Sequence, residues 1–190
     1  MPDSPPGFNR YCIDADDRIE SVNANWVTFA RGNGASELHG DAVIGQSLWT
    51  FVQGDEIEEL YRAVFERVRS LDVSIMLPFR CDSPDLRRYM RLVVQRRRGA
   101  SLQVDAVTIR EQPQLHVNLL EPTGVRSDLS LSICGHCKRV LVSGEEWIEP
   151  EDAALRLQLL ESEGVPRLDH RVCPDCVRIF ESSGSGIGAH

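Results

Sequence analysis

The clearest hydrophobic pattern in the chain lies between residues 55 and 70. Asp55 at its start, with Glu58 three residues later, is expected to cap a helix. Arg67 and Arg69 would meet the negative end of its dipole. The apolar side chains recur at the spacing of one helix face: Ile57, Leu60, Tyr61, Val64, Phe65 and Val68. The pattern therefore predicts an amphipathic helix with one buried side.

Two strand-like stretches precede this helix. Residues 11–13 and 18–22 predict short strands around the turn at 14–17, and residues 23–30 follow as a short helix.

Three strand-like stretches follow the long helix. Apolar and polar side chains alternate over residues 73–79, where Pro78 implies an edge position or a bulge because it cannot donate to a ladder. Residues 89–95 and 102–109 are separated by residues 96–100, which are typical of a hairpin connection. Two strands, helices and then three strands predict an α+β fold, with an antiparallel sheet and its helices gathered on one side.

The rest of the chain has a weaker pattern. Residues 112–130 contain prolines, glycine and scattered polar residues and are expected to form a linker. Residues 1–9 are expected to be a disordered tail and residues 182–190 a flexible one. Residues 151–162 predict a second helix, with Pro150 at its entry.

The most specific chemistry lies in two Cys-x-x-Cys pairs on either side of this second helix. They are Cys134 and Cys137 in Cys-Gly-His-Cys, and Cys173 and Cys176 in Cys-Pro-Asp-Cys. Two such pairs supply the four thiolates of a structural zinc site with no open coordination position. His136 and His170 are alternative ligands, but we expect them beside the site or at the surface. A segment of about fifty residues has little core of its own, so a bound metal would account for its stability.

The Cys-Gly-His-Cys pair has two other interpretations. A thiol–disulfide oxidoreductase uses one such pair at the start of a helix in a thioredoxin-like fold. The chain is too short for that fold in addition to the first domain, and the second pair would have no role. A redox sensor whose zinc site releases metal on oxidation is the other alternative.

Composition and charge limit the partners. The 190-residue chain has a net charge of −8, and residues 128–181 hold eleven acidic and six basic side chains. This balance disfavours nucleic acid, because phosphate contacts need clustered Lys and Arg. No apolar run reaches the roughly 18–20 residues of a membrane span, and no secretory signal is visible at the start. We therefore expect a cytoplasmic protein, where paired cysteines favour metal or redox chemistry over disulfides.

Three short motifs add to the element order of the first 111 residues. They are Tyr-Cys-Ile-Asp-Ala-Asp-Asp-Arg-Ile at 11–19, Val-Asn-Ala-Asn-Trp at 22–26 and Val-Ile-Gly-Gln-Ser-Leu-Trp at 43–49. Together with the long helix and the last three strands, they resemble a PAS sensory domain over residues 10–111. The resemblance implies a small ligand or cofactor held between sheet and helices, or a dimerisation role, and the relay of a signal.

The same resemblance allows two cofactors to be assessed. Flavin-adduct PAS domains carry a reactive cysteine in Gly-Arg-Asn-Cys, whereas the similar stretch at 45–48 has Leu48 in that place. Haem-binding PAS domains commonly supply a histidine from the long helix, and residues 55–70 contain none. We therefore expect neither a flavin adduct nor a His-ligated haem, and the sequence does not name the ligand.

A second resemblance covers the cysteine pairs. Residues 133–140, 147–148 and 170–176 are similar to a cysteine-rich segment that follows PAS and related modules in bacterial signalling proteins. The two pairs, the tryptophan between them and the histidine three residues before the third cysteine all recur there. The resemblance implies a bacterial-type signalling protein.

Two groups of side chains in the PAS-like part are each open to two interpretations. Trp26, Trp49 and Phe65 either line a ligand pocket or pack the core, and core packing is the simpler expectation. Arginines on the last strands and their hairpin form either a solvated face or a docking surface for an acidic partner or for the acidic C-terminal segment. They are Arg80, Arg87, Arg88, Arg91, Arg96, Arg97 and Arg98, with Arg87, Arg88 and Arg91 as the candidate partner contacts.

The sequence shows no nucleophile–base constellation and no kinase, cyclase or phosphatase signature. We therefore expect a non-enzymatic protein: a PAS-like sensor over residues 10–111, the linker 112–130, and a four-cysteine zinc segment over 131–181 that mediates protein interaction. The expected partners are a signalling protein, a second copy of the chain and a small ligand, without membrane or nucleic acid. A change in PAS packing would pass through the linker to the zinc segment.

Overall fold

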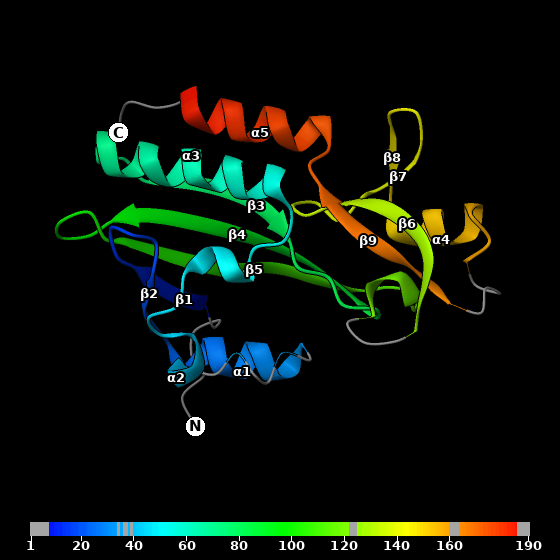
Figure 1. The fold of residues 1–190 in the computed structure, drawn as a ribbon, viewed down its shortest axis with the longest axis horizontal. Coiled ribbons are helices and arrows are strands. Elements are labelled where there is room, and N and C mark those ends of the chain that lie inside the picture. Colours follow the sequence, from blue (N-terminus) through cyan, green and yellow to red (C-terminus); the bar gives the residue numbers. More distant parts are fainter. Residues whose placement is uncertain are drawn as a thin grey trace.

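The structure, a computed structural model, contains two sheets and several helices that pack into one body (Figure 1). The described residues are 8–33, 35, 38, 40–121, 125–159 and 164–185. Parts of the expected tails, of the expected linker and of the expected second helix lie outside them: residues 1–7, 186–190, 122–124 and 160–162.

The first sheet and its helices follow the predicted order of two strands, helices and three strands. The elements are β1 (Phe8–Ile13), β2 (Ile19–Val22), α1 (Ala24–Gly32), α2 (Gly40–Val43), the 3₁₀ helix η1 (Leu48–Phe51), α3 (Asp55–Leu71), β3 (Ile75–Arg80), β4 (Leu86–Arg96) and β5 (Leu102–Pro113). The strands are antiparallel and lie in the order β2-β1-β5-β4-β3. The α+β class is therefore confirmed, and Pro78 lies in an edge strand.

Strand β1 corrects the predicted start of the folded part. It begins at Phe8, and Phe8 and Asn9 pair with Val107 and Ala106 of β5. Residues 8 and 9 thus belong to the sheet rather than to a disordered tail, because β5 supplies a pairing partner that the N-terminal composition does not reveal.

Helix α3 begins at the predicted residue and ends one residue later than predicted, but it lacks the predicted cap. Its N-cap residue is Gly54, and no side chain caps this end. Asp55 lies in the first turn instead, and Glu58 forms an ion pair with Arg62 at 2.7 Å. At the other end Arg69 donates to Asp17 at 2.6 Å.

The inner face of the five-stranded sheet is buried under α3. Val64, Phe65 and Val68 of α3 pack in one cluster with Leu77 and Val104 of the sheet. Each such side chain contributes roughly 1.5–3 kcal/mol when it leaves water. Residues of the opposite face are exposed, as Met76, Arg91 and Gln95 show. The sheet therefore carries its helices on one side.

The expected linker at 112–130 is wrong as a description of this part of the chain. β5 extends to Pro113, a short 3₁₀ helix η2 covers Asn118–Leu120, and β6 already begins at Arg126. Val117 and Leu119 are buried. Proline and polar residues made the segment resemble a linker, but its apolar residues lie under the second sheet.

The C-terminal part holds a second sheet and two helices. The elements are β6 (Arg126–Cys134), β7 (Val140–Ser143), β8 (Glu146–Ile148), α4 (Pro150–Arg156), β9 (Val165–Arg171) and α5 (Pro174–Ser185). The strand order is β8-β7-β6-β9, and β6 and β9 are parallel. The described helix α4 is shorter than predicted, and residues 182–185 belong to α5 rather than to a flexible tail. None of the described helices is both long and apolar enough to cross a membrane.

The two parts share one buried core. Helix α5 lies beside α3 over the first sheet (Figure 1). Its Phe180 belongs to the same buried cluster as Phe65 and Leu77, and so do Cys134 and Cys173. The cysteine segment is therefore packed into the core of the five-stranded part.

Candidate metal centre and adjoining cavity

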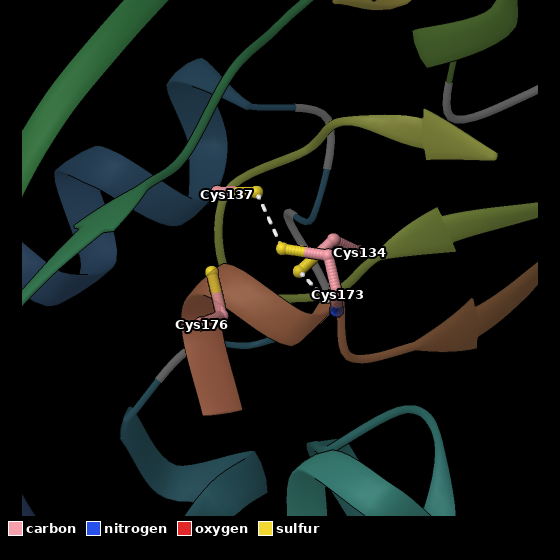
Figure 2. A group of neighbouring side chains, drawn as sticks. All are labelled: Cys134, Cys137, Cys173 and Cys176. Atoms are coloured by element: carbon pink, nitrogen blue, oxygen red, sulfur yellow. Dashed lines mark hydrogen bonds between the residues drawn. The ribbon is translucent and has the colours of Figure 1, made fainter. Parts of the chain in front are cut away.

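All four predicted cysteine ligands come together where the second sheet ends and α5 begins (Figure 2). Their Sγ atoms all lie within 4.8 Å of one another, and those of Cys137 and Cys173 are 3.6 Å apart. Cys137 is half-buried and the other three are buried. Four thiolates arranged tetrahedrally at about 2.3 Å from zinc would lie about 3.8 Å apart. The spacing therefore fits one closed four-sulfur metal site.

The first cysteine pair is held by a tight turn between β6 and β7. The Lys138 amide donates to the Cys134 carbonyl at 2.9 Å, and Lys138 adopts a left-handed conformation with φ of 68°. The Cys134 amide donates to the Arg139 carbonyl at 2.7 Å. The Gly135 amide donates to the carbonyl of Arg171 at 2.9 Å. The turn is thus fastened to β9 as well as to itself.

The second pair lies at the entry to α5. Pro174 is the first residue of the helix, where its fixed φ is favourable. The amide of Cys176 donates to the Cys173 carbonyl at 2.9 Å. The Cys173 amide donates to Sγ of Cys134 at 3.4 Å, a contact that stabilises a thiolate.

The crowding of the thiols shifts their pKa values in opposite directions. Hydrogen bonds from the neighbouring thiols lower the pKa of Cys134. Hydrogen bonds to the same neighbours raise the pKa of Cys176. Four adjacent sulfurs cannot all be thiolates without a cation, because like charges destabilise one another. A divalent metal such as zinc would supply that charge.

His136, inside the Cys-Gly-His-Cys turn, is not in the group of sulfur ligands. Its side chain is 1% exposed and lies among three aromatic rings, those of Tyr61, Phe79 and Phe180. The Phe180 ring is closest, with 4.7 Å between centroids. The Tyr61 hydroxyl and His136 Nδ1 form a hydrogen bond of 3.2 Å. Burial lowers the pKa of His136.

His170 lies on β9, opposite the start of α3. Its carbonyl oxygen faces Gly54 so closely that a Cβ there would lie 2.2 Å away. Burial lowers the pKa of His170. Neither histidine is part of the four-sulfur group, which leaves the metal set as the four cysteines.

The predicted basic surface is largely engaged within the chain. Arg80 donates to Glu149 at 2.5 Å, and Arg87 pairs with both Glu149 and Glu151 at the start of α4. Arg88 pairs with Glu111 at 3.0 Å. The contacts of Arg80 and Arg87 correspond to the docking of the acidic C-terminal segment, whereas Glu111 lies on β5 of the first sheet. Arg91, in contrast, is exposed on β4.

The three predicted pocket residues all line a single cavity. Trp26, Trp49 and Phe65 face a space of about 330 Å³ between the first sheet and helices α1 and α3. Phe65 also belongs to the buried core, so the two interpretations of this group overlap. The sequence analysis missed Asn9 and Tyr11, which line the cavity from β1. Asn9 and Tyr11 alternate in the sequence with Phe8 and Arg10, which would indicate a strand with two faces. The predicted strand begins only at residue 11, so this pattern was not used.

Comparison with known proteins adds little to this picture. No family model matches the chain, and no curated protein matches it. Among solved structures, a domain of an HTR-like protein from Haloarcula marismortui ATCC 43049 aligns with a TM-score of 0.37 and 15% identity. The alignment covers 54% of this chain and 98% of that domain. A TM-score this low carries no argument about fold or function.

Proposed function

We propose that the chain is a non-enzymatic sensor and relay protein. In this proposal the cavity takes up a neutral, mainly apolar small molecule, and the four cysteines hold a structural zinc ion beside it. The proposal rests mainly on one observation: the cavity is uncharged and aromatic, and its wall lies next to the cysteine turn. The proposal includes a PAS-like fold for the first part of the chain, which the order of its helices and strands supports.

The wall chemistry supports a neutral occupant. No charged side chain among the described residues lines the cavity. Aromatic rings come from β1, α1, η1, α3 and β3, including Tyr11, Trp26, Trp49, Phe65 and Phe79. A charged ligand would lose its hydration without gaining a counter-ion, which is strongly unfavourable.

Two polar groups on β1 offer hydrogen bonds to such a ligand. Asn9 and Tyr11 point to the same side of the sheet and line the cavity. In the part of the chain that the structure describes, neither side chain has a hydrogen-bond partner. Burial raises the pKa of Tyr11, so its phenol stays neutral and remains a donor. Buried polar groups are normally paired, and a ligand with one polar group would pair with them.

The volume limits the size of the ligand. An apolar cavity of about 150 Å³ accommodates one benzene ring. The cavity of about 330 Å³ is therefore suited to a ligand of two fused rings or similar bulk. Ala106, the inward residue between Asn9 of β1 and Leu92 of β4, provides this space because its side chain is small.

Closed coordination by four cysteines supports a structural role for the metal. A bound zinc would supply cross-links between the β6–β7 turn and the start of α5. The four-sulfur cluster favours this over dithiol exchange, which needs only one pair. A change in packing would pass from the first sheet to the cysteine segment directly, because α5 and the cysteine turn pack on α3 and β3. It would not need a linker.

Partner contacts belong to the same proposal. We place the surface for a signalling protein, or for a second copy of the chain, on the open face of the first sheet near Arg91. The reason is that Arg87 and Arg88 are engaged within the chain. Cross-linking through a cysteine introduced by Arg91→Cys would identify the neighbour.

Three bicyclic probes test the cavity. We expect 2-naphthol to bind and to quench Trp26 and Trp49 fluorescence at neutral pH. Naphthalene should bind more weakly than 2-naphthol. The affinity for 2-naphthoate should be lower than that for 2-naphthol by about tenfold or more, because its charge would be buried. Ala106→Leu should abolish binding by filling the cavity, whereas Ala15→Leu in an exposed turn should not.

Two results would contradict the cavity function. One is the absence of binding for all three probes. The other is equal binding by the wild-type chain and the Ala106→Leu variant.

A further inference from the structure

His136 connects the cavity to the cysteine turn. Its ring lies 6.2 Å from the Tyr61 ring and 6.4 Å from the Phe79 ring, measured between centroids. Tyr61 and Phe79 also line the cavity. The same two side chains therefore form the cavity wall on one side and the packing surface of His136 on the other.

A continuous row of rings leads from the cavity to this histidine. The Trp49 and Phe65 centroids are 5.6 Å apart, those of Phe65 and Tyr61 are 6.3 Å apart, and Tyr61 then contacts His136. Packed interiors are nearly incompressible, so a displaced ring displaces its neighbours.

The histidine cannot move independently of the cysteines. Its main chain lies between Cys134 and Cys137, and its carbonyl accepts a hydrogen bond of 2.9 Å from the Arg80 amide. This bond covers the edge of β3, beside Pro78, which has no amide hydrogen. Phe180 of α5 closes the other side of the imidazole. A shift of Tyr61 is therefore transmitted to the turn that carries the first cysteine pair.

We propose that His136 is a positioning residue that couples occupancy of the cavity to metal retention at the four cysteines. The proposal rests on the ligand-binding function given above. A ligand that moves Tyr61 or Phe79 changes the geometry of the Cys134–Cys137 turn and hence the rate at which metal leaves it. By linkage, a bound metal changes ligand affinity by the same factor that the ligand changes metal affinity.

The test measures zinc release from the full chain to the chromogenic chelator 4-(2-pyridylazo)resorcinol, with and without saturating 2-naphthol. We expect the ligand to change the zinc affinity about fivefold or more, and the release rate to change with it. In Tyr61→Phe, which keeps the ring but removes the hydrogen bond to Nδ1, this ratio should fall towards one. The matched control is Tyr89→Phe on β4, which lies outside the cavity lining and whose hydroxyl accepts from Arg87, and it should retain the full ratio.

A second measurement, of zinc release without added ligand, tests the proposal even if 2-naphthol does not bind. Phe79→Leu removes a ring that touches both the cavity and His136, and should speed zinc release several-fold. Phe29→Leu is the matched control, because it removes a ring from the cavity wall on α1, whereas the described rings that contact His136 are those of Tyr61, Phe79 and Phe180. It should leave the rate unchanged.

The outcomes separate the two proposals. Failure of all three probes to bind contradicts the cavity function alone, and the Phe79 and Phe29 variants then decide the coupling. Binding without any change in release rate, or equal rates for the Phe79→Leu and Phe29→Leu variants, would overturn the role of His136.

Discussion

At the scale of single residues, Gly54 determines how closely the two parts of the chain approach. It precedes α3 with a φ of 95°, a conformation that side chains with a Cβ rarely adopt. A Cβ there would lie 2.2 Å from the carbonyl oxygen of His170 on β9. No side chain fits in this contact, so glycine is required for steric as well as conformational reasons.

We expect Gly54→Ala to lower the free energy of unfolding by roughly 2–3 kcal/mol or more, through strain and separation of α3 from β9. Gly99→Ala is the matched control, because Gly99 has a φ of 70° but open space around it. Its loss should be only about 1 kcal/mol. Urea denaturation of both variants measures the difference, and equal losses would show that the close approach to β9 is unimportant.

At the scale of elements, the docking of α4 depends on a cluster of charges. Glu149, just before α4, pairs with Arg80 at 2.5 Å and with Arg139 at 3.4 Å. Arg80 is also paired with Asp82, and both of these side chains are buried. Breaking a buried ion pair costs more than breaking an exposed one, because the remaining charge is left without a partner.

Glu149 gives this docking a pH dependence. Burial alone would raise the pKa of Glu149, but the hydrogen bond and charge of Arg80 outweigh it and lower the pKa below its usual 4.5. A carboxylate whose folded pKa is lowered stabilises the fold above its unfolded pKa, and this contribution is lost as the pH falls through the folded value.

We therefore expect Glu149→Gln to destabilise the chain by about 1–3 kcal/mol at neutral pH. The difference from wild type should shrink as the pH falls below 4.5. Thermal unfolding across this pH range checks it, with Glu145→Gln in the neighbouring exposed turn as control. A difference that stays constant down to acid pH would show that the ionised carboxylate is not the stabilising form.

The elements also show what sequence patterns reveal. Helix α3 and strands β3 to β5 were predictable, because each carries its own apolar periodicity and depends on sheet contacts that are close in sequence. β6 and β9 were not, because they pair in parallel over a separation of about forty residues. Helix α5 was missed because its apolar face packs on α3, β3 and His136, which lie far from it in the sequence.

At the scale of the whole molecule, the four cysteines and the five-stranded part share one packed core. Cys134, Cys173 and Cys176 belong to the same buried cluster as Val64 and Phe65 of α3. Loss of a cross-link there would therefore loosen the packing of the five-stranded part as well as the second sheet.

The spacing of the cysteines predicted which side chains would meet, because each Cys-x-x-Cys turn brings its own two sulfurs together. The location of the cluster against α3 could not be predicted, since it depends on the packing of α5. The same holds for His136, which we expected beside the metal site or at the surface. Its ring is buried against Tyr61, which also lines the cavity.

The most direct test of the account is the metal content of the purified full chain, measured by native mass spectrometry together with insulin-disulfide reduction. We predict one tightly held zinc per chain, lost in Cys173→Ser but retained in Cys81→Ser, which alters a cysteine outside the cluster. Neither protein should reduce insulin. A metal-free wild-type chain that reduces insulin disulfides would contradict the central claim.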